Sequence, residues 1–161
     1  MDYAWWVYLH IVGAFAFVFG HGASGLAAFR IRATRDPAQI RTLLDLSSLS
    51  LGLTYVGLLL LLIGGIAAAI AGNHFSRGWT WAALGLLLVI IIAMYAMATP
   101  FYGRLRVAAG VRAKDPKVDP NPVVSQSDID TLAGSSRPMV LLAIGGVGLI
   151  LILWLMVIKP F

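Results

Sequence analysis

The chain has 161 residues, 60% of them hydrophobic and 12% charged, with no cysteine and a formal net charge of +5. The apolar share lies well above that of a soluble domain and indicates a chain that resides in a lipid bilayer. Because cysteine is missing, disulfides, thiolate metal sites, iron–sulfur clusters and covalent c-type haem attachment are excluded.

Four stretches each supply the roughly 20 apolar residues that a helix needs to cross the hydrocarbon core. These stretches are residues 5–29, 49–71, 79–101 and 139–158. The first stretch lacks the basic start of a secretion signal and is too long for one, so we expect it to be retained. We therefore predict an all-α fold, in which residues 1–161 form a single four-helix transmembrane bundle.

The basic residues predict the orientation of this bundle. Ten of the 12 lie in the two longer connections, residues 30–48 and 102–138, and only Arg77 and Lys159 lie elsewhere. Since basic loops stay on the cytoplasmic side, we expect both termini outside, in a bacterial inner membrane. A basic face beside anionic lipid explains the net charge, so the lipid bilayer is the expected partner and nucleic acid is not.

Local signals mark several helix ends. Asp36 followed by Pro37 predicts an N-cap and first helical residue for the second helix. Pro100 is expected to close or kink the third span. Three prolines make residues 114–126 an extended linker, after which Ser127 is expected to cap a short helix.

Two histidines lie inside the first span. Residues 10 and 21 are eleven apart, which is three helical turns plus about 20°, so His10 and His21 share one stripe about 16 Å apart along the axis. An ionisable side chain at membrane depth is a functional hypothesis by default. The structural alternative is a neutral imidazole that bonds to a neighbouring helix.

Neutral imidazole is an axial ligand of haem iron, and small neighbours let a flat macrocycle approach the helix. The stripe of the two histidines is mostly small, with one aromatic residue between them. It includes Gly13, Ala14, Phe17 and Ser24. We therefore expect haem b as the cofactor, with His10 and His21 as the iron ligands and these neighbours around it.

Depth along the spans suggests partners for each histidine. Tyr55, Met94 and Met97 fall near the level of His21, and methionine is a known haem ligand. Met156 falls near the level of His10, which His74 of the short outer loop could also reach. A two-fold dimer in which each histidine meets its own copy is a further alternative.

The segment "WVYLHIVGAFAF" and the later "RATRDP" resemble the first helix and loop of a group of small bacterial membrane proteins. The group comprises HemJ-type protoporphyrinogen oxidases, CopD-type copper-resistance membrane domains and an uncharacterised integral-membrane family. The resemblance implies a four-helix bundle that carries b-type haem on His10. HemJ-type enzymes pair this histidine with a lysine on a later span, whereas the first lysine here is Lys114. The resemblance therefore implies haem binding rather than their oxidase reaction.

The leading hypothesis is a haem b-binding membrane protein with a role in electron transfer or haem-linked redox chemistry. One alternative is a non-catalytic accessory or assembly subunit of a larger membrane complex, since the glycines and basic loops need no cofactor. Another is a small transporter or proton relay that uses the histidines. No span contains Asp, Glu, Lys or Arg, which weakens this last alternative.

Overall fold

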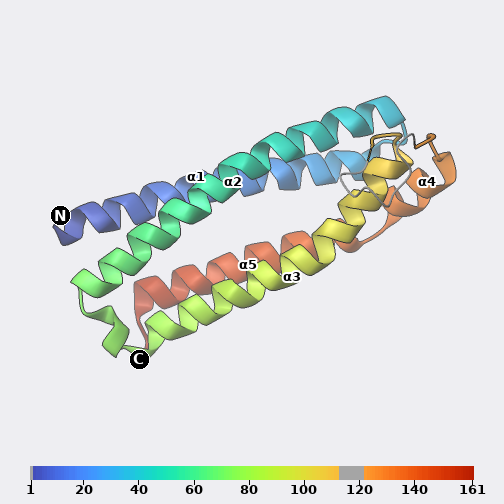
Figure 1. Ribbon diagram of the computed structural model, residues 1–161. Coiled ribbons are helices and arrows are strands. Elements are labelled where there is room, and N and C mark those ends of the chain that lie inside the picture. The colour runs from blue at the N-terminus through green and yellow to red at the C-terminus, as the bar shows by residue number, and fades with distance from the viewer. Residues whose placement is uncertain (1, 113–121) are drawn as a thin grey trace.

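The computed structural model describes residues 2–112 and 122–161, and all of its regular elements are helices. The four long helices are α1 (Tyr3–Ala33), α2 (Pro37–Ala71), α3 (Gly78–Ala108) and α5 (Arg137–Ile158). Two short elements connect them, η1 (His74–Ser76) and α4 (Gln126–Gly134). Both termini and η1 lie at one end of the elongated bundle and α4 at the other (Figure 1). We refer to these as the η1 end and the α4 end.

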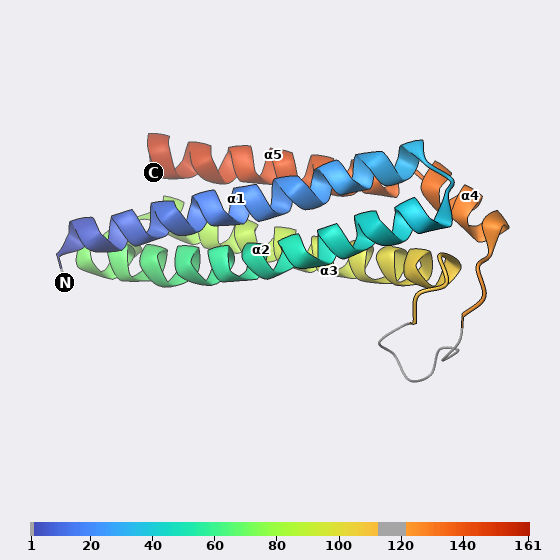
Figure 2. The same ribbon diagram turned by 90° about the horizontal axis from the view of Figure 1, so that it is seen from above.

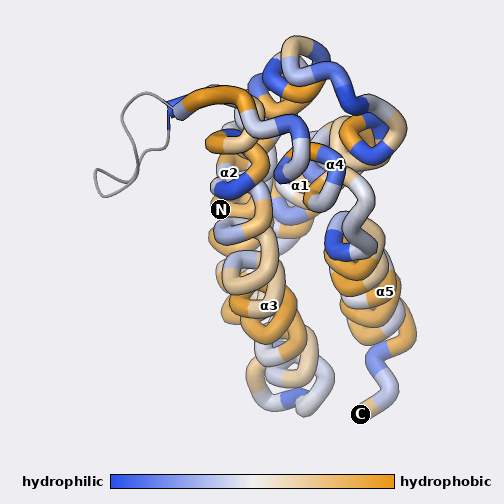
Figure 3. The backbone as a smooth tube through the Cα atoms, turned by 90° about the vertical axis from the view of Figure 1, so that its right-hand side faces the viewer, coloured by the Kyte–Doolittle hydropathy of each residue, from blue (hydrophilic) through white to orange (hydrophobic). Residues whose placement is uncertain are grey.

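Each long helix is long and apolar enough to cross a membrane, as expected for a multi-pass membrane protein. Large apolar side chains are exposed along all four helices, which suits a surface that faces lipid rather than water. Hydrophilic residues gather around α4 and its neighbouring loops, while the tubes of α3 and α5 are mainly hydrophobic (Figure 3). This confirms the predicted all-α class and the presence of four helices that are long and apolar enough to span a membrane.

The bundle consists of two closely packed helix pairs, α1 with α2 and α3 with α5, and contacts between the pairs are sparse. Figure 2 shows the two helices of the first pair running side by side and antiparallel. Glycines bring their backbones together. A Cβ atom on any of them would meet the backbone of the facing helix within 3.0 Å. These glycines are Gly13 and Gly20 on α1, and Gly57 and Gly64 on α2.

On each helix these glycines are seven residues apart. A seven-residue contact repeat is typical of a left-handed helix pair with a continuous contact seam. Without water to drive apolar association, such close backbone packing is a main source of helix pairing in a membrane. The pair α1–α2 is therefore the more closely packed half of the bundle.

The two pairs meet at the α4 end, in a fully buried apolar core. It comprises Ile31, Ile40, Leu44, Phe101, Leu105, Ala108, Ala109 and Ile129. Polar bonds reinforce this end, because Arg41 Nε donates to the carbonyl of Ala109 at 2.6 Å and Arg106 donates to the carbonyl of Leu44 at 2.9 Å. The bundle is therefore closed at the α4 end, and any space between the pairs must lie towards the η1 end.

The structure confirms one predicted helix start and corrects two other boundaries. Asp36 accepts a bond from the Ala38 amide at 3.0 Å and caps α2, as expected. Pro100 does not end α3, which continues to Ala108 because Phe101 and Leu105 are buried in the core. The short helix α4 is capped by Ser125 rather than Ser127.

Helical structure extends into both longer connections. As predicted, the second helix starts at Pro37, which leaves only a few residues between Ala33 and Pro37. The last turns of α3 and all of α4 lie inside the range 102–138. Most of the extended linker expected at residues 114–126 lies outside the described residues.

Candidate functional site

A cavity of about 660 Å³ lies between the two helix pairs and reaches the η1 end. Its walls come from α1, α2, α3 and α5, and most of them are apolar. Representative wall residues are Ile11, Leu58, Leu62, Leu87, Leu149 and Ile152. This volume falls in the range of pockets that enclose a small organic ligand or cofactor.

His10 lines this cavity, and its ring orientation is fixed by α2. Its Nδ1 atom lies 2.8 Å from the carbonyl oxygen of Leu61. A carbonyl oxygen can only accept, so Nδ1 carries the hydrogen and donates it. In the neutral imidazole the other nitrogen, Nε2, then has a free lone pair. This is the arrangement by which proteins orient a histidine that ligates a metal.

Two adjacent glycines of α2 make room for His10. A Cβ atom at Gly64 would lie 2.5 Å from the backbone nitrogen of His10. A Cβ atom at Gly65 would lie 2.7 Å from Nδ1 of the His10 ring. Gly64 therefore admits the helix backbone, and Gly65 admits the imidazole.

Polar groups gather where the cavity reaches the η1 end. His74 lines the cavity, its Nε2 lies 3.3 Å from the Tyr3 hydroxyl, and its carbonyl accepts a bond from the Thr80 hydroxyl at 2.7 Å. Among the described residues, His74 Nδ1 and Trp79 Nε1 are buried without a hydrogen-bond partner. Buried polar atoms are normally paired, so these two nitrogens require an explanation.

Lys159 completes this end of the cavity. It follows α5 in a left-handed backbone conformation, and its Nζ lies 5.5 Å from the ring centre of Trp79. Burial lowers the pKa of His74 below 6.5, and the positive charges of Lys159 and Arg77 lower this pKa further. The surroundings of His74 therefore disfavour its protonated form.

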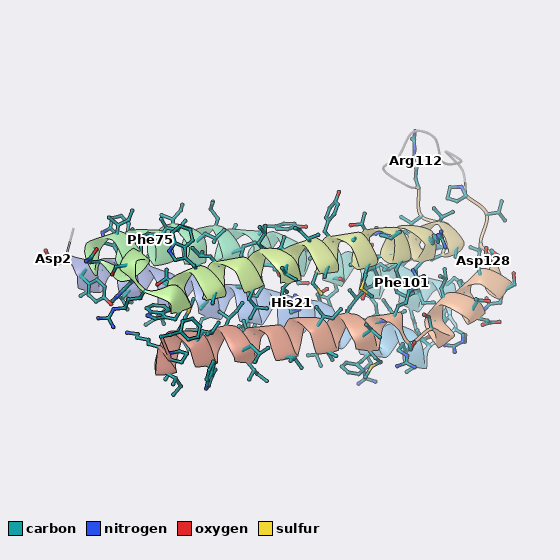
Figure 4. All side chains as sticks on the ribbon, turned by 90° about the horizontal axis from the view of Figure 1, so that it is seen from below. Asp2, His21, Phe75, Phe101, Arg112 and Asp128 are labelled. Atoms are coloured by element: carbon teal, nitrogen blue, oxygen red, sulfur yellow. The ribbon has the colours of Figure 1, made fainter. Side chains whose placement is uncertain are left out.

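His21 lies elsewhere. Its ring stacks on Phe17 with a centroid distance of 5.7 Å and an interplanar angle of 3°. Its Nε2 faces α5, where a Cβ atom at Gly145 would lie 2.8 Å away. His21 does not line the cavity, and Figure 4 shows it between the end that carries Phe75 and the end that carries Phe101. The structure thus separates the two histidines, His10 facing α2 and His21 facing α5.

Of the other residues expected around a cofactor, Ala14, Phe17 and His74 line the cavity with His10. Met156, matched to His10 by depth, lines it as well. Gly13 does not line the cavity, because it is pressed against the backbone of Leu60 and Leu61 in the α1–α2 seam.

The remaining expected residues lie away from the cavity. Ser24 bonds to Ser47 at 2.7 Å and so links α1 to α2. Tyr55 is 62% exposed on the outer surface of the bundle, and Met94 and Met97 are half-buried on α3. Comparison of depth along the spans therefore identified residues that line the same cavity as His10. It could not predict which helix faces meet at the level of His21.

The sequence reasoning missed Gly65, Trp79 and Lys159 as parts of the site. Lys159 carried a usable signal, because it is one of only two basic residues outside the long connections. Within the described residues, no group of three His, Asp or Glu side chains is placed to hold a bare metal ion. A haem iron needs only one or two protein ligands, so the lack of such a three-residue group has no bearing on haem binding.

Comparisons with protein families, curated proteins and solved structures find no match for this chain. The function must therefore be argued from the cavity itself.

Proposed function

We propose that this protein binds haem b in the cavity between its two helix pairs, with His10 as an axial ligand, and serves in electron transfer or haem-linked redox chemistry. The observation that carries the proposal is the 2.8 Å bond from His10 Nδ1 to the Leu61 carbonyl, on the wall of a cavity of about 660 Å³. His21 is not part of the proposed site, because it does not line this cavity.

The residues present fit such a cofactor. The carbonyl bond fixes the tautomer and makes Nε2 a better electron donor, as expected for a ligating histidine. Gly65 leaves the ring unobstructed on the α2 side. The mainly apolar wall suits a large flat macrocycle, and it would keep water from the iron and so tune the reduction potential of the haem.

The iron would supply one-electron redox chemistry, and the protein supplies binding, orientation and electrostatics. His10 would hold the iron through its Nε2 atom. The closely packed α1–α2 pair keeps that ligand in place, because the backbones are in contact at His10 itself and again at Gly13, one turn further along α1. The apolar side chains of α3 and α5 cover the opposite side of the cavity.

We further propose that the η1 end, with both termini, faces the outside of a bacterial inner membrane. The positive-inside rule supports this orientation, since Arg30, Arg32, Arg41 and Arg106 lie towards the α4 end and few basic residues lie at the other.

Titration of the detergent-purified protein with ferric protoporphyrin tests the proposal. A saturable shift of the Soret band is expected for the wild type, lost or weakened at least tenfold in His10→Ala and retained in His21→Ala. Circular dichroism melting of each variant establishes that it is folded. A wild type that gives no saturable shift contradicts haem binding, and equal binding by His10→Ala contradicts the assigned ligand.

A further inference from the structure

We propose that the η1 end of the cavity is a carboxylate-binding site, in which Lys159 pairs with the acidic group of the molecule that fills the cavity. Under the proposed function, that group is a haem propionate, so the choice of ligand rests on that proposal. The assignment of Lys159 itself rests on the distribution of charge and polarity along the cavity.

The cavity is polar at only one end. From the level of His10 towards α4 its walls are apolar side chains such as Leu58, Leu87 and Leu149. At the η1 end they include Tyr3, His74, Thr80 and Lys159. A ligand that fills this space is therefore expected to be amphipathic, with its polar edge towards η1.

The sign of the charge at that end selects an anion. Of the described residues that line the cavity, Lys159 alone carries a full positive charge, and none carries a negative one. The ion pairs within the described part of the chain are Arg35–Asp130 and Arg106–Asp45, both at the α4 end. Lys159 thus has no acidic side chain within ion-pair distance among the described residues, and it is exposed, so its ammonium is accessible to an anion that enters this end of the cavity.

The neighbouring nitrogens favour the same ligand chemistry. Trp79 is 8% exposed, and its Nε1–H is a donor that lacks an acceptor among the described residues. His74 Nδ1 is unpaired as well, and the Lys159 ammonium lies on the Trp79 ring. A carboxylate offers several acceptor positions and a negative charge, so it suits both the ammonium and a neighbouring donor.

Substitution of Lys159 distinguishes carboxylate binding at the η1 end from haem binding in general. Lys159→Gln removes the charge and keeps a long side chain in the same backbone position, whereas Lys159→Arg keeps the charge. Arg77→Gln is the matched control, because it removes a charge from the same end at a residue that does not line the cavity.

Each variant is titrated with ferric protoporphyrin, which has two carboxylates, and with its dimethyl ester, which has none. We expect Lys159→Gln to weaken binding of the diacid about tenfold and to leave the diester unchanged. Lys159→Arg and Arg77→Gln should stay close to wild type. Equal affinity of the wild type and Lys159→Gln for the diacid overturns the inference, even if haem binds.

The carboxylate could instead belong to a fatty acid. Palmitate tests this alternative, with palmityl alcohol as its uncharged counterpart. If haem fails to bind but palmitate binds in a Lys159-dependent manner, the proposed function is wrong and the carboxylate site stands. If neither acid binds in a Lys159-dependent manner, the inference is overturned.

Discussion

The imidazole of His10 occupies the space that a side chain at position 65 would need, since a Cβ atom on Gly65 would lie 2.7 Å from Nδ1. The same nitrogen donates to Leu61, one helical turn earlier on α2. The orientation of the His10 ring therefore depends on the lack of a side chain at Gly65 as much as on the hydrogen bond to the Leu61 carbonyl.

Gly65→Ala should displace the His10 ring from the Leu61 carbonyl. We expect haem affinity to fall on the order of tenfold, since mutations that disturb the support of a ligand have effects of that size. Gly52→Ala is the control on the same helix, because a Cβ there meets nothing within 4 Å. Affinities from Soret titration check the prediction, and parallel losses in both variants would speak against a specific role for Gly65.

The α1–α2 seam should tolerate no added methyl group. In Gly20→Ala the new Cβ would lie 2.8 Å from the Ser50 carbonyl oxygen, and we expect a loss of about 1–3 kcal/mol in the free energy of unfolding from overpacking. Gly22→Ala, two residues further along α1 in open space, should be neutral or stabilising. Denaturation in mixed micelles measures both, and equal stabilities would argue against the tight seam.

The Ser24–Ser47 bond should contribute modestly to helix pairing. Interhelical hydrogen bonds in membranes are worth about 0.6 kcal/mol on average, so a double-mutant cycle with Ser24→Ala and Ser47→Ala should give a coupling free energy of that order. Additive effects of the two substitutions would show that the 2.7 Å contact contributes nothing.

Acidification should destabilise the η1 end through His74. Burial first, then the charges of Lys159 and Arg77, lowers the pKa of His74 below 6.5 in the folded protein. Below pH 6.5 the unfolded chain therefore binds a proton that the folded state resists, so stability falls as the pH decreases. Melting temperatures from about pH 7.5 to about pH 5.5 should drop more for the wild type than for His74→Gln. Identical drops would contradict this assignment.

Hydropathy was sufficient to predict the four long helices, because a span needs about 20 apolar residues whatever it packs against. Asp36 and Pro37 predicted the start of α2 for a similarly local reason. Pro100 was expected to close or kink α3, and it does not close it, since burial of Phe101 and Leu105 in the core stabilises the helix beyond the proline. Local signals failed where tertiary packing decided.

The two histidines show this limit most clearly. Residues eleven apart share one face of a straight helix, and this placed His10 and His21 on one stripe. The α1–α2 seam repeats every seven residues, however, and relative to such a seam a residue eleven positions along is rotated by about 50°. His10 consequently meets α2 while His21 meets α5. Spacing along α1 could not predict which helix each histidine faces, because this depends on where the partner helices lie around α1.

The central claim is that His10 ligates an iron in the cavity, and chemical rescue tests it most directly. The reduced-minus-oxidised absorption spectrum of haem-loaded His10→Gly is recorded with and without added imidazole, which fits the space vacated inside a cavity of about 660 Å³. We predict that the wild-type spectrum is lost in this variant and restored by imidazole. A His10→Gly protein whose spectrum matches the wild type without imidazole would contradict the account.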